Sequence, residues 1–274
     1  MKTLYVADLD GTLLNSKGQL SDFTKSTLNS LISHGLNFTV NTSRTPKSAE
    51  MILKDLKLKL PAIMMNGSAF YCAAEKKILE FFPIPSHAAR KVCAQVLKSG
   101  GEPFLFGFDG KEIDVIYSKA ESILAQKFIA RRQRYYRSFK KCDYISPCND
   151  TLYIICVGDR DTLEIAKEKI DSIRELSSSL FISDEGGCYL EIYSALSGKW
   201  MATKKFMEIY GFDKCVCFGD NLNDIEMLKN ADFGICVANG YKEAKLAADL
   251  VIESADNDSV AKYLMIEWSR SMEL

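Results

Sequence analysis

Two aspartates two residues apart, Asp8 and Asp10, end the first apolar segment of the chain within the sequence Asp-Leu-Asp-Gly-Thr. Two carboxylates at the end of a buried strand are costly to desolvate unless a cation or a proton compensates them. A second acidic stretch, Gly-Asp-Asn-Leu-Asn-Asp at 219–224, also follows an apolar segment. Oxygen ligands without histidine or cysteine favour magnesium over zinc. The two stretches together therefore predict a magnesium site.

Hydroxyl and basic side chains occur at two further points along the chain. Thr42, Ser43 and Arg44 follow the second apolar segment, and Lys199 follows a glycine. Phosphoryl transfer needs a nucleophile, a divalent ion and cations around the three equatorial oxygens of the phosphoryl group. A carboxylate can be the nucleophile, and a second carboxyl can protonate the leaving oxygen and later deprotonate water. The residue types are therefore those that phosphoryl transfer requires.

These chemical groups follow the strands of a predicted parallel sheet. Strands and helices alternate in the first and last parts of the chain, which implies right-handed crossovers between parallel strands. Ligands of such sheets bind outside the carboxyl ends of the strands, where the strand order reverses. Strands are expected at 3–7, 36–41, 62–65, 214–218 and 233–237, and helices at 21–34, from 46, at 200–210 and at 224–229.

The middle of the chain has a different pattern. Strands joined by tight glycine turns indicate an antiparallel α+β unit between about 84 and 190. The predicted fold class is therefore α/β, a doubly wound, Rossmann-like parallel sheet with an inserted α+β domain. The predicted core comprises residues 1–83 and 191–274, and the predicted insert comprises 84–190.

One segment of the insert is strongly basic, with seven basic residues and no acid between 127 and 141. Its spacing predicts one helix with a basic face and an apolar face. The basic face is either a solvated surface, which is the simpler interpretation, or a surface that attracts an anionic substrate. The basic face comprises Lys127, Arg131, Arg134, Arg137 and Lys141, and the apolar face comprises Leu124, Phe128, Tyr135 and Phe139.

The overall composition excludes several classes of partner. Lys and Arg number 35 and Asp and Glu 36, so the formal net charge is −1. A near-neutral protein has no overall field that attracts nucleic acid or anionic lipid. No apolar run approaches the roughly 18 residues of a membrane span, and nine cysteines without a paired spacing argue against a disulfide framework. We expect a cytoplasmic protein, a monomer or weak homodimer, that contacts neither nucleic acid nor membrane.

The motifs, taken in their order, resemble those of the haloacid dehalogenase (HAD) superfamily. Asp-Leu-Asp-Gly-Thr-Leu-Leu at 8–14, Thr42, Lys199 and Gly-Asp-X-X-Asn-Asp-X-X-Met at 219–227 are similar to its four motifs. The long insertion between the second and third motifs resembles the type II (IIB) cap of the Cof-like phosphatases. The resemblance covers the whole chain. It implies a magnesium-dependent phosphoric monoester hydrolase for small phosphorylated metabolites, such as sugar phosphates, with a cap that selects the substrate.

The resemblance also implies a role for each matching residue. Asp8 would be the nucleophile, and Asp10 would be the general acid/base with its backbone carbonyl on the metal. Thr42 and Lys199 would be catalytic through their contacts with the phosphoryl oxygens. The metal ligands would be Asp8, Asp10, Asp220, Asn223 and Asp224, the last two directly or through water. The substrate-binding residues would be Thr42, Ser43, Arg44, Asn66, Lys199 and Asn223, with a plain turn as the alternative for Asn66.

One residue bears on the reaction class, and another departs from the pattern of the family. Dehalogenases of the superfamily lack an acid at the position of Asp10 and its ATPases carry threonine there, so Asp10 favours a phosphatase or a phosphomutase. Ser43 departs from the Thr-Gly-Arg that is usual in Cof-like proteins. If this position requires a positive φ, serine costs about 1 kcal/mol. The alternatives left open are a sugar phosphomutase and a non-catalytic phospho-ligand-binding protein on the same fold.

Overall fold

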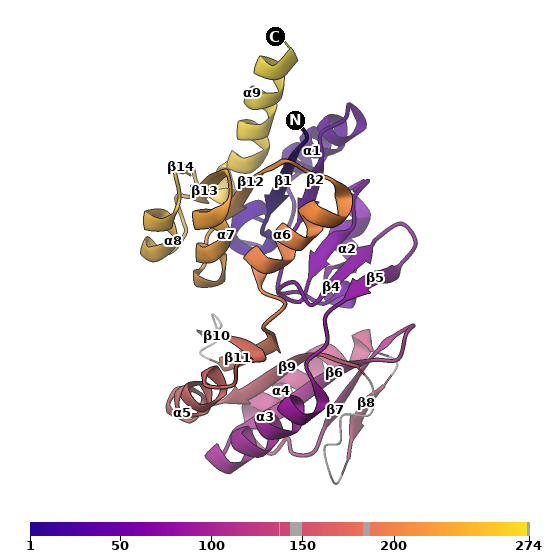
Figure 1. Cartoon of the computed structure of the whole chain (residues 1–274), viewed down its shortest axis with the longest axis vertical. Helices are drawn as coiled ribbons and strands as arrows, with labels where there is room; N and C mark the ends of the chain where they lie inside the picture. Colours follow the sequence, from indigo (N-terminus) through magenta and orange to yellow (C-terminus); the bar gives the residue numbers. More distant parts are fainter. Residues whose placement is uncertain (137, 143–149, 183–186, 273–274) are drawn as a thin grey trace. The chain divides into compact units, whose positions relative to one another are not determined.

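The computed structural model describes residues 1–274 except 137, 143–149, 183–186 and 273–274. The chain divides into two compact units (Figure 1). We call Met1–Glu80 with Lys199–Leu274 the core unit, and Phe81–Gly198 the insert unit. The second division falls later than the expected 190, because strand β11 (Cys188–Ser194) is hydrogen-bonded into the sheet of the insert unit.

The core unit is built on a five-stranded parallel sheet in the order β14-β13-β12-β1-β2. Its central strands read as nearly continuous apolar runs, as expected for strands of a parallel sheet that is covered on both faces. The strand order reverses between β1 and β12, because β2 lies on one side of β1 and the later strands lie on the other. The strands are β1 (Thr3–Ala7), β2 (Phe38–Val40), β12 (Lys214–Gly219), β13 (Phe233–Val237) and β14 (Leu250–Ile252).

Two helices of the core unit begin with the signals that the sequence indicated. Ser21 caps α1 (Asp22–Ser33), since its side chain accepts a hydrogen bond from the Thr24 backbone N–H at 2.9 Å. Pro46 is the first residue of α2 (Pro46–Asp55). Two groups of helices pack together in this unit (Figure 1). One contains α6 (Lys199–Tyr210), α7 (Ile225–Asn230) and α8 (Lys242–Ala247), and the other contains α1 and α9 (Ser259–Met272).

The core unit has a second, three-stranded sheet that was not predicted, and this sheet includes the strand that was expected at 62–65 in the parallel sheet. It has the order β3-β4-β5 and consists of β3 (Ala62–Met64), β4 (Ala69–Cys72) and β5 (Lys77–Phe81). β3 pairs antiparallel with β4, and Ile63 also bridges Asn41 at the end of β2. β4 has only four residues, and β5 mixes charged with apolar side chains and is largely exposed. Neither strand therefore carries a clear alternating pattern.

The insert unit contains a six-stranded sheet in the order β10-β11-β9-β6-β7-β8. Its described pairings are antiparallel except that of β7 with β8. Helices α3 (Ser86–Ser99) and α5 (Arg160–Asp171) pack on this sheet and bury apolar side chains such as Val92, Ile154 and Leu163. The remaining strands are β6 (Glu102–Phe108), β7 (Ile113–Tyr117), β8 (Phe139–Lys141), β9 (Asp150–Gly158) and β10 (Leu176–Ile182).

The basic segment 127–141 is not one helix, so this prediction was wrong. Helix α4 (Ile123–Arg132) is followed by a single 3-10 turn, and Phe139 begins the edge strand β8. The rings of Phe128 and Phe139 both pack against Phe104 of β6, at centroid distances of 4.5 and 6.1 Å. Burial of these rings on the sheet outweighs the helical periodicity. Lys127, Arg131, Arg134 and Lys141 therefore do not share one helix face, and Arg137 lies outside the described residues.

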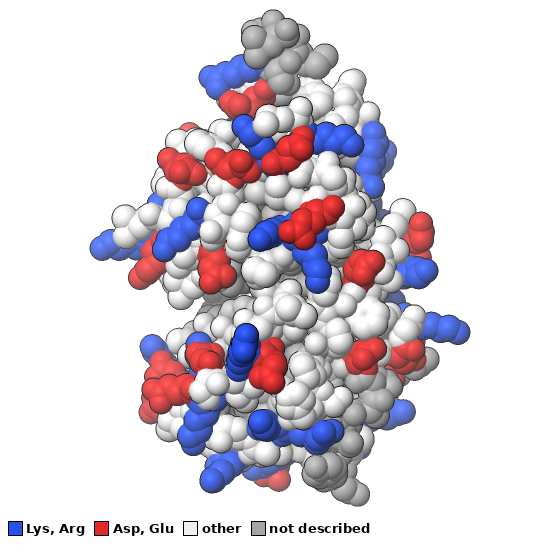
Figure 2. All heavy atoms as spheres, in the orientation of Figure 1, with Lys and Arg blue, Asp and Glu red and all other residues white. Residues whose placement is uncertain are grey.

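The described surface agrees with the balanced composition. On the face shown in Figure 2, acidic and basic side chains are interspersed and do not gather by sign. Within the described part of the chain, no helix is long and apolar enough to cross a membrane.

Ser21 yields a test of the helix cap. Its hydroxyl also donates to Asp258 Oδ1, ahead of α9. We expect Ser21→Ala to lower the free energy of unfolding by about 1–2 kcal/mol, because the cap and this tertiary hydrogen bond are both lost. Urea unfolding measures the effect. In the same helix, Ser26→Ala should change stability by less than about 0.5 kcal/mol, since the exposed Ser26 hydroxyl bonds within its own turn. Equal unfolding midpoints for the two variants would contradict the assignment.

Candidate active site

The candidate site lies at the carboxyl ends of β1 and β12, the neighbouring strands between which the strand order reverses. Asp8 directly follows β1, and its backbone N–H donates to the Phe218 carbonyl of β12 at 3.0 Å. Asp220 directly follows β12. This is the position in open α/β sheets at which ligands bind.

Lys199, the first residue of α6, lies between two of the acids. Its Nζ is 2.6 Å from Asp8 Oδ1 and 2.6 Å from Asp224 Oδ1. The three side chains are buried, with 2%, 7% and 0% of the surface of Lys199, Asp8 and Asp224 exposed. Burial raises the pKa of Asp8 well above its ordinary value; Lys199 opposes this shift and the neighbouring acids add to it. Burial lowers the pKa of Lys199, but Asp224 and Asp8 outweigh it, so the net pKa is raised. Burial is thus the main cause of the raised pKa of Asp8, and the neighbouring carboxylates are the cause of the raised pKa of Lys199.

Asp224 closes the acidic loop 219–224 on itself. Its second oxygen, Oδ2, accepts hydrogen bonds from the backbone N–H groups of Asp220 at 3.1 Å and Asn221 at 3.0 Å. A Cβ at Gly219 would lie 2.5 Å from the Cβ of Asp224, so only glycine allows this close approach. Both carboxylate oxygens of Asp224 are thus engaged by Lys199 and by the loop.

Asp220 has a different environment. One of its oxygens accepts a hydrogen bond from the Thr12 hydroxyl at 2.9 Å. Burial and the neighbouring Asp224 raise the pKa of Asp220 to about 6. Ligand oxygens of Asp8, Asp220 and Asp224 all lie within 4.8 Å of one another. Such a cluster of carboxylates around one lysine has the charge and the hard oxygen donors that suit a divalent cation.

The second motif lies beside these acids at the end of β2. The backbone N–H of Thr42 donates to Ile63 at 3.0 Å, and its hydroxyl accepts from the Arg44 N–H at 3.2 Å. Ser43 is half-buried, and its φ is not positive, so the backbone cost considered for serine does not arise. The non-glycine residues of the described chain that do have positive φ are Met65, Asn66, Lys76 and Asp258.

Arg44 binds the carboxylate of Asp10 with both arms of its guanidinium. The distance from Nε to Oδ2 is 2.7 Å and that from Nη2 to Oδ1 is 2.6 Å. The Asp10 side chain is half exposed, at 51%. The Asp10 carboxylate therefore contacts Arg44 and is not part of the carboxylate cluster of Asp8, Asp220 and Asp224 that could hold a metal ion.

Asn66 faces the fourth motif. It is fully buried, and its Oδ1 accepts a hydrogen bond from Asn223 Nδ2 at 3.1 Å. Met65, Asn66 and Gly67 have consecutive positive φ values of 54°, 50° and 87°, an unfavourable backbone for the first two residues. The Oδ1 of Asn223 is buried and has no hydrogen-bond partner among the described residues. A strained turn thus places Asn66 against Asn223, whose free oxygen is available to a ligand.

Three residues outside the predicted list make contacts in the site. Thr12 donates to Asp220 as described above, and its position within the first motif could have indicated it as a site residue. Asn41 donates to the Lys199 carbonyl at 2.9 Å and to the Thr203 hydroxyl at 3.1 Å, which ties the start of α6 to the end of β2. One indication of Asn41 was available from the sequence, since it is an amide side chain at the end of an apolar strand. Asn239 donates to the Gly11 carbonyl at 2.7 Å, and no sequence pattern indicated it.

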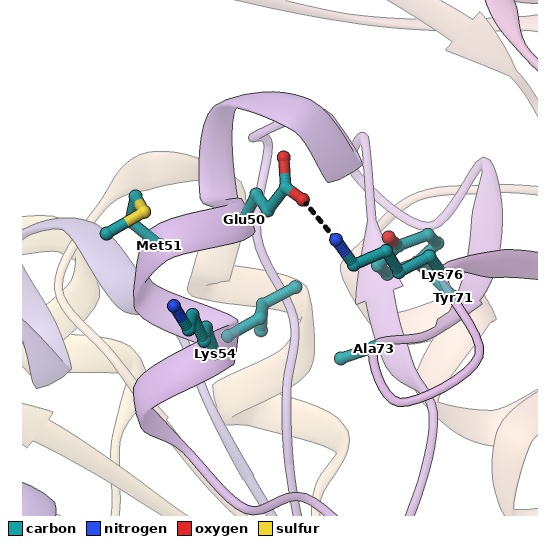
Figure 3. Close-up of a pocket in the computed structure, with 7 residues that line it drawn as sticks. Glu50, Met51, Lys54, Tyr71, Ala73 and Lys76 are labelled. Carbon is teal, nitrogen blue, oxygen red and sulfur yellow. Dashed lines mark hydrogen bonds and ion pairs between the residues drawn. The ribbon is translucent and has the colours of Figure 1, made fainter.

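A cavity of about 260 Å³ lies elsewhere in the core unit, between α2 and the β4–β5 segment (Figure 3). The Glu50–Lys76 ion pair, 3.0 Å long, lies at its edge. Its lining includes none of the residues predicted for the site, so the acidic cluster and this cavity are separate features. The lining residues are Glu50, Met51, Leu53, Lys54, Tyr71, Ala73 and Lys76.

The chain is similar to known proteins over nearly its whole length. The sequence profile of the haloacid dehalogenase-like hydrolases matches residues 5–264. The 5-amino-6-(5-phospho-D-ribitylamino)uracil phosphatase of Bacillus subtilis is 26% identical, covering 94% of this chain and 95% of that protein. An HMP-PP phosphatase of Escherichia coli is 27% identical, covering 96% and 95%. The solved structure of the HAD subclass IIB sugar phosphatase BT4131 has a TM-score of 0.76 at 18% identity, covering 97% of this chain and 98% of that one.

The chain therefore belongs to the haloacid dehalogenase-like hydrolase family, which confirms the predicted resemblance to the superfamily. The similarity of fold to subclass IIB confirms the α/β class with its additional sheets. Within the family, the protein is an enzyme of the Cof-like branch, a phosphoric monoester hydrolase of the HAD type.

The loop after β1 provides a test of the close packing. Gly11 has a φ of +79°, and a Cβ there would lie 2.4 Å from Asp220 Oδ2. We expect Gly11→Ala to lower the free energy of unfolding by at least about 2 kcal/mol, because backbone strain and overlap with the carboxylate add together. Phosphatase activity should fall with it, since Asp220 must move. Urea unfolding and a phosphate-release assay measure the two effects.

Gly18 is the matched control for this variant. Its φ is +69°, but a Cβ there would meet nothing within 4 Å. Gly18→Ala should therefore show the backbone cost of about 1–2 kcal/mol alone, with unchanged activity. If both variants had the same stability and activity, the overlap with Asp220 would be unimportant.

Proposed function

We propose that the chain is a magnesium-dependent phosphatase that hydrolyses small phosphorylated metabolites, sugar phosphates in particular, through an aspartyl-phosphate on Asp8. The observation that supports this most strongly is the buried cluster of Asp8, Asp220 and Asp224 around Lys199. It combines a fixed cation with an excess of carboxylates, which is a suitable environment for a divalent ion and a phosphoryl group.

The donor atoms of the site fit magnesium. Asp8 and Asp220 would bind it with carboxylate oxygens, together with the backbone carbonyl of Asp10. Asn223 would contribute its buried Oδ1, directly or through water, since no described residue uses this oxygen. Asp224, predicted as a ligand directly or through water, would act through water, because Lys199 and two backbone N–H groups already engage its oxygens. When bound, the ion neutralises charge that develops on the phosphoryl oxygens.

The side chains divide the reaction into two steps. In the first, an Asp8 oxygen forms a bond to phosphorus while the bond from phosphorus to the leaving oxygen breaks, and Asp10 gives its proton to that oxygen. In the second, Asp10 takes a proton from water, the water oxygen bonds to phosphorus, and the bond between Asp8 and phosphorus breaks. Lys199 orients Asp8 and favours its ionised form through the 2.6 Å contact with Oδ1. The backbone N–H of Thr42 already donates to the Ile63 carbonyl, so the Thr42 hydroxyl is the group that would donate to a phosphoryl oxygen.

The names of the relatives support the substrate class. They include phosphatases of a phosphoribitylamino-uracil and of HMP-PP, and a sugar phosphatase of the same fold. We place substrate selection in the insert, predicted as 84–190, with the reducing cytoplasm as the compartment. The cysteines of the described chain are free, which suits that compartment. A monomer or weak homodimer stays a prediction.

Replacement of the nucleophile tests the proposed reaction. Asp8→Asn should reduce magnesium-dependent phosphate release from p-nitrophenyl phosphate by at least about 10³-fold, because an amide is not a nucleophile here. A chelator should abolish the wild-type activity, and a panel of phosphorylated metabolites should identify the preferred ester. Asp22→Asn is a control on an exposed aspartate of the core unit and should keep full activity.

Three results would oppose the proposal. Activity retained in Asp8→Asn would rule out an aspartyl-phosphate on Asp8 as the intermediate. Little free phosphate together with a need for a bisphosphate activator would indicate the phosphomutase. Binding of phosphorylated ligands without turnover would indicate the non-catalytic alternative.

Magnesium should also stabilise the fold, which gives a readout that does not depend on activity. At a concentration 100 times the dissociation constant, the ion should add about 2.7 kcal/mol to the free energy of unfolding. Thermal unfolding with and without magnesium measures this stabilisation as a rise in Tm. Asp220→Asn should lose most of the rise, since it removes a ligand. An equal rise in Tm in this variant would show that Asp220 is not a ligand of the ion.

A further inference from the structure

The ion pair of Arg44 with Asp10 connects the second motif with the first. Both oxygens of the Asp10 carboxylate are bound by one guanidinium, at 2.6 and 2.7 Å. A two-armed contact of this kind fixes both the position and the plane of a carboxylate, because the guanidinium is rigid and flat. The geometry is thus specific, although the pair is partly exposed to solvent, with 27% of Arg44 and 51% of Asp10 accessible.

Arg44 is itself held in place at the end of the sheet. Its carbonyl accepts the Met65 N–H at 3.0 Å, and its own N–H donates to the Thr42 hydroxyl at 3.2 Å. Its Nη1 donates to the Ser48 carbonyl in the first turn of α2 at 3.4 Å. Asp10 lies in the tight loop after β1, next to Gly11, whose carbonyl accepts a hydrogen bond from Asn239. The side chain of Arg44 thus has an attachment to the first turn of α2 in addition to its contact with Asp10.

We propose that Arg44 is a positioning residue for Asp10, the acid/base of the proposed reaction, and not primarily a substrate contact as the sequence predicted. The inference rests on the proposed function. When one arm of the contact opens, one Asp10 oxygen becomes free to exchange a proton with the leaving oxygen or with water. The other arm keeps the carboxyl in place during that exchange. Loss of Arg44 would leave the half-exposed side chain of Asp10 with several orientations, few of which suit proton transfer.

Esters that differ in their need for an acid can separate the two roles of Arg44. p-Nitrophenyl phosphate and phenyl phosphate have similar shapes, but the p-nitrophenolate ion leaves without help whereas the more basic phenolate ion benefits from protonation. A residue that acts through Asp10 affects kcat/KM mainly for phenyl phosphate, since this constant reports the step in which the leaving group departs. A residue that binds the phosphoryl group affects both esters alike.

Arg44→Gln should lower kcat/KM for phenyl phosphate by roughly 10- to 100-fold and that for p-nitrophenyl phosphate by less than about 3-fold. Asp10→Asn should show the same pattern with a larger loss. The double variant should match Asp10→Asn alone, because Arg44 has nothing left to position. Arg44→Lys should resemble Arg44→Gln, since lysine keeps the charge but cannot make the two-armed contact. Arg270→Gln removes an exposed arginine that pairs with Glu267 at 2.7 Å and should behave as wild type.

Three outcomes would overturn the inference. One is an equal loss on both esters, accompanied by weaker competitive inhibition by inorganic phosphate. Another is additive losses in the double variant, and the third is wild-type behaviour of Arg44→Lys. Failure of the proposed function would look different, because wild-type protein would then release no phosphate from either ester, or Asp8→Asn would stay active.

Discussion

Burial of more negative than positive charge at the ends of β1 and β12 is the constraint on which the core unit depends. Carboxylates removed from water are costly unless each finds a cation or hydrogen-bond donors. Lys199 supplies a cation to Asp8 and Asp224, and the Thr12 hydroxyl serves Asp220. These partners do not balance the cluster, and burial together with the neighbouring acids keeps the pKa values of Asp8 and Asp220 raised. This imbalance is the physical argument for the divalent ion of the proposed function.

The cluster exists only because segments far apart in the sequence come unusually close. Gly11 and Gly219 lack the Cβ atoms that would collide with Asp220 and Asp224. Amide side chains then tie the converging loops together: Asn41 holds the carbonyl of Lys199, and Asn239 holds that of Gly11. The parallel sheet supplies the convergence, since its strands deliver their carboxyl ends to one edge. The glycines let the loops approach closely and the amides hold them there, which defines the site.

Local chemistry made much of this arrangement predictable from the sequence. Ser21 and Pro46 start helices through a side-chain acceptor and a fixed φ, and the acids follow apolar strands. The β4–β5 segment was missed because its strands are short or largely exposed. The 127–141 segment was misread because aromatic burial on the sheet outweighs helical periodicity. The contacts of Arg44 with Asp10 and of Asn66 with Asn223 depend on loop conformations that residue spacing does not encode.

The four aspartates show how environment differentiates one residue type. Asp224 has no exposed surface and its oxygens are engaged by Lys199 and backbone N–H groups, which suits support of a loop. Asp8 faces the same lysine through Oδ1 alone, which leaves its other oxygen for the attack in the proposed reaction. Asp220 accepts one hydroxyl, which leaves capacity for a metal. Asp10 alone of the four is half exposed and paired with a guanidinium. The acid/base of the proposed reaction must change its partners, and Asp10 is the one of these four carboxyls that is accessible enough to do so.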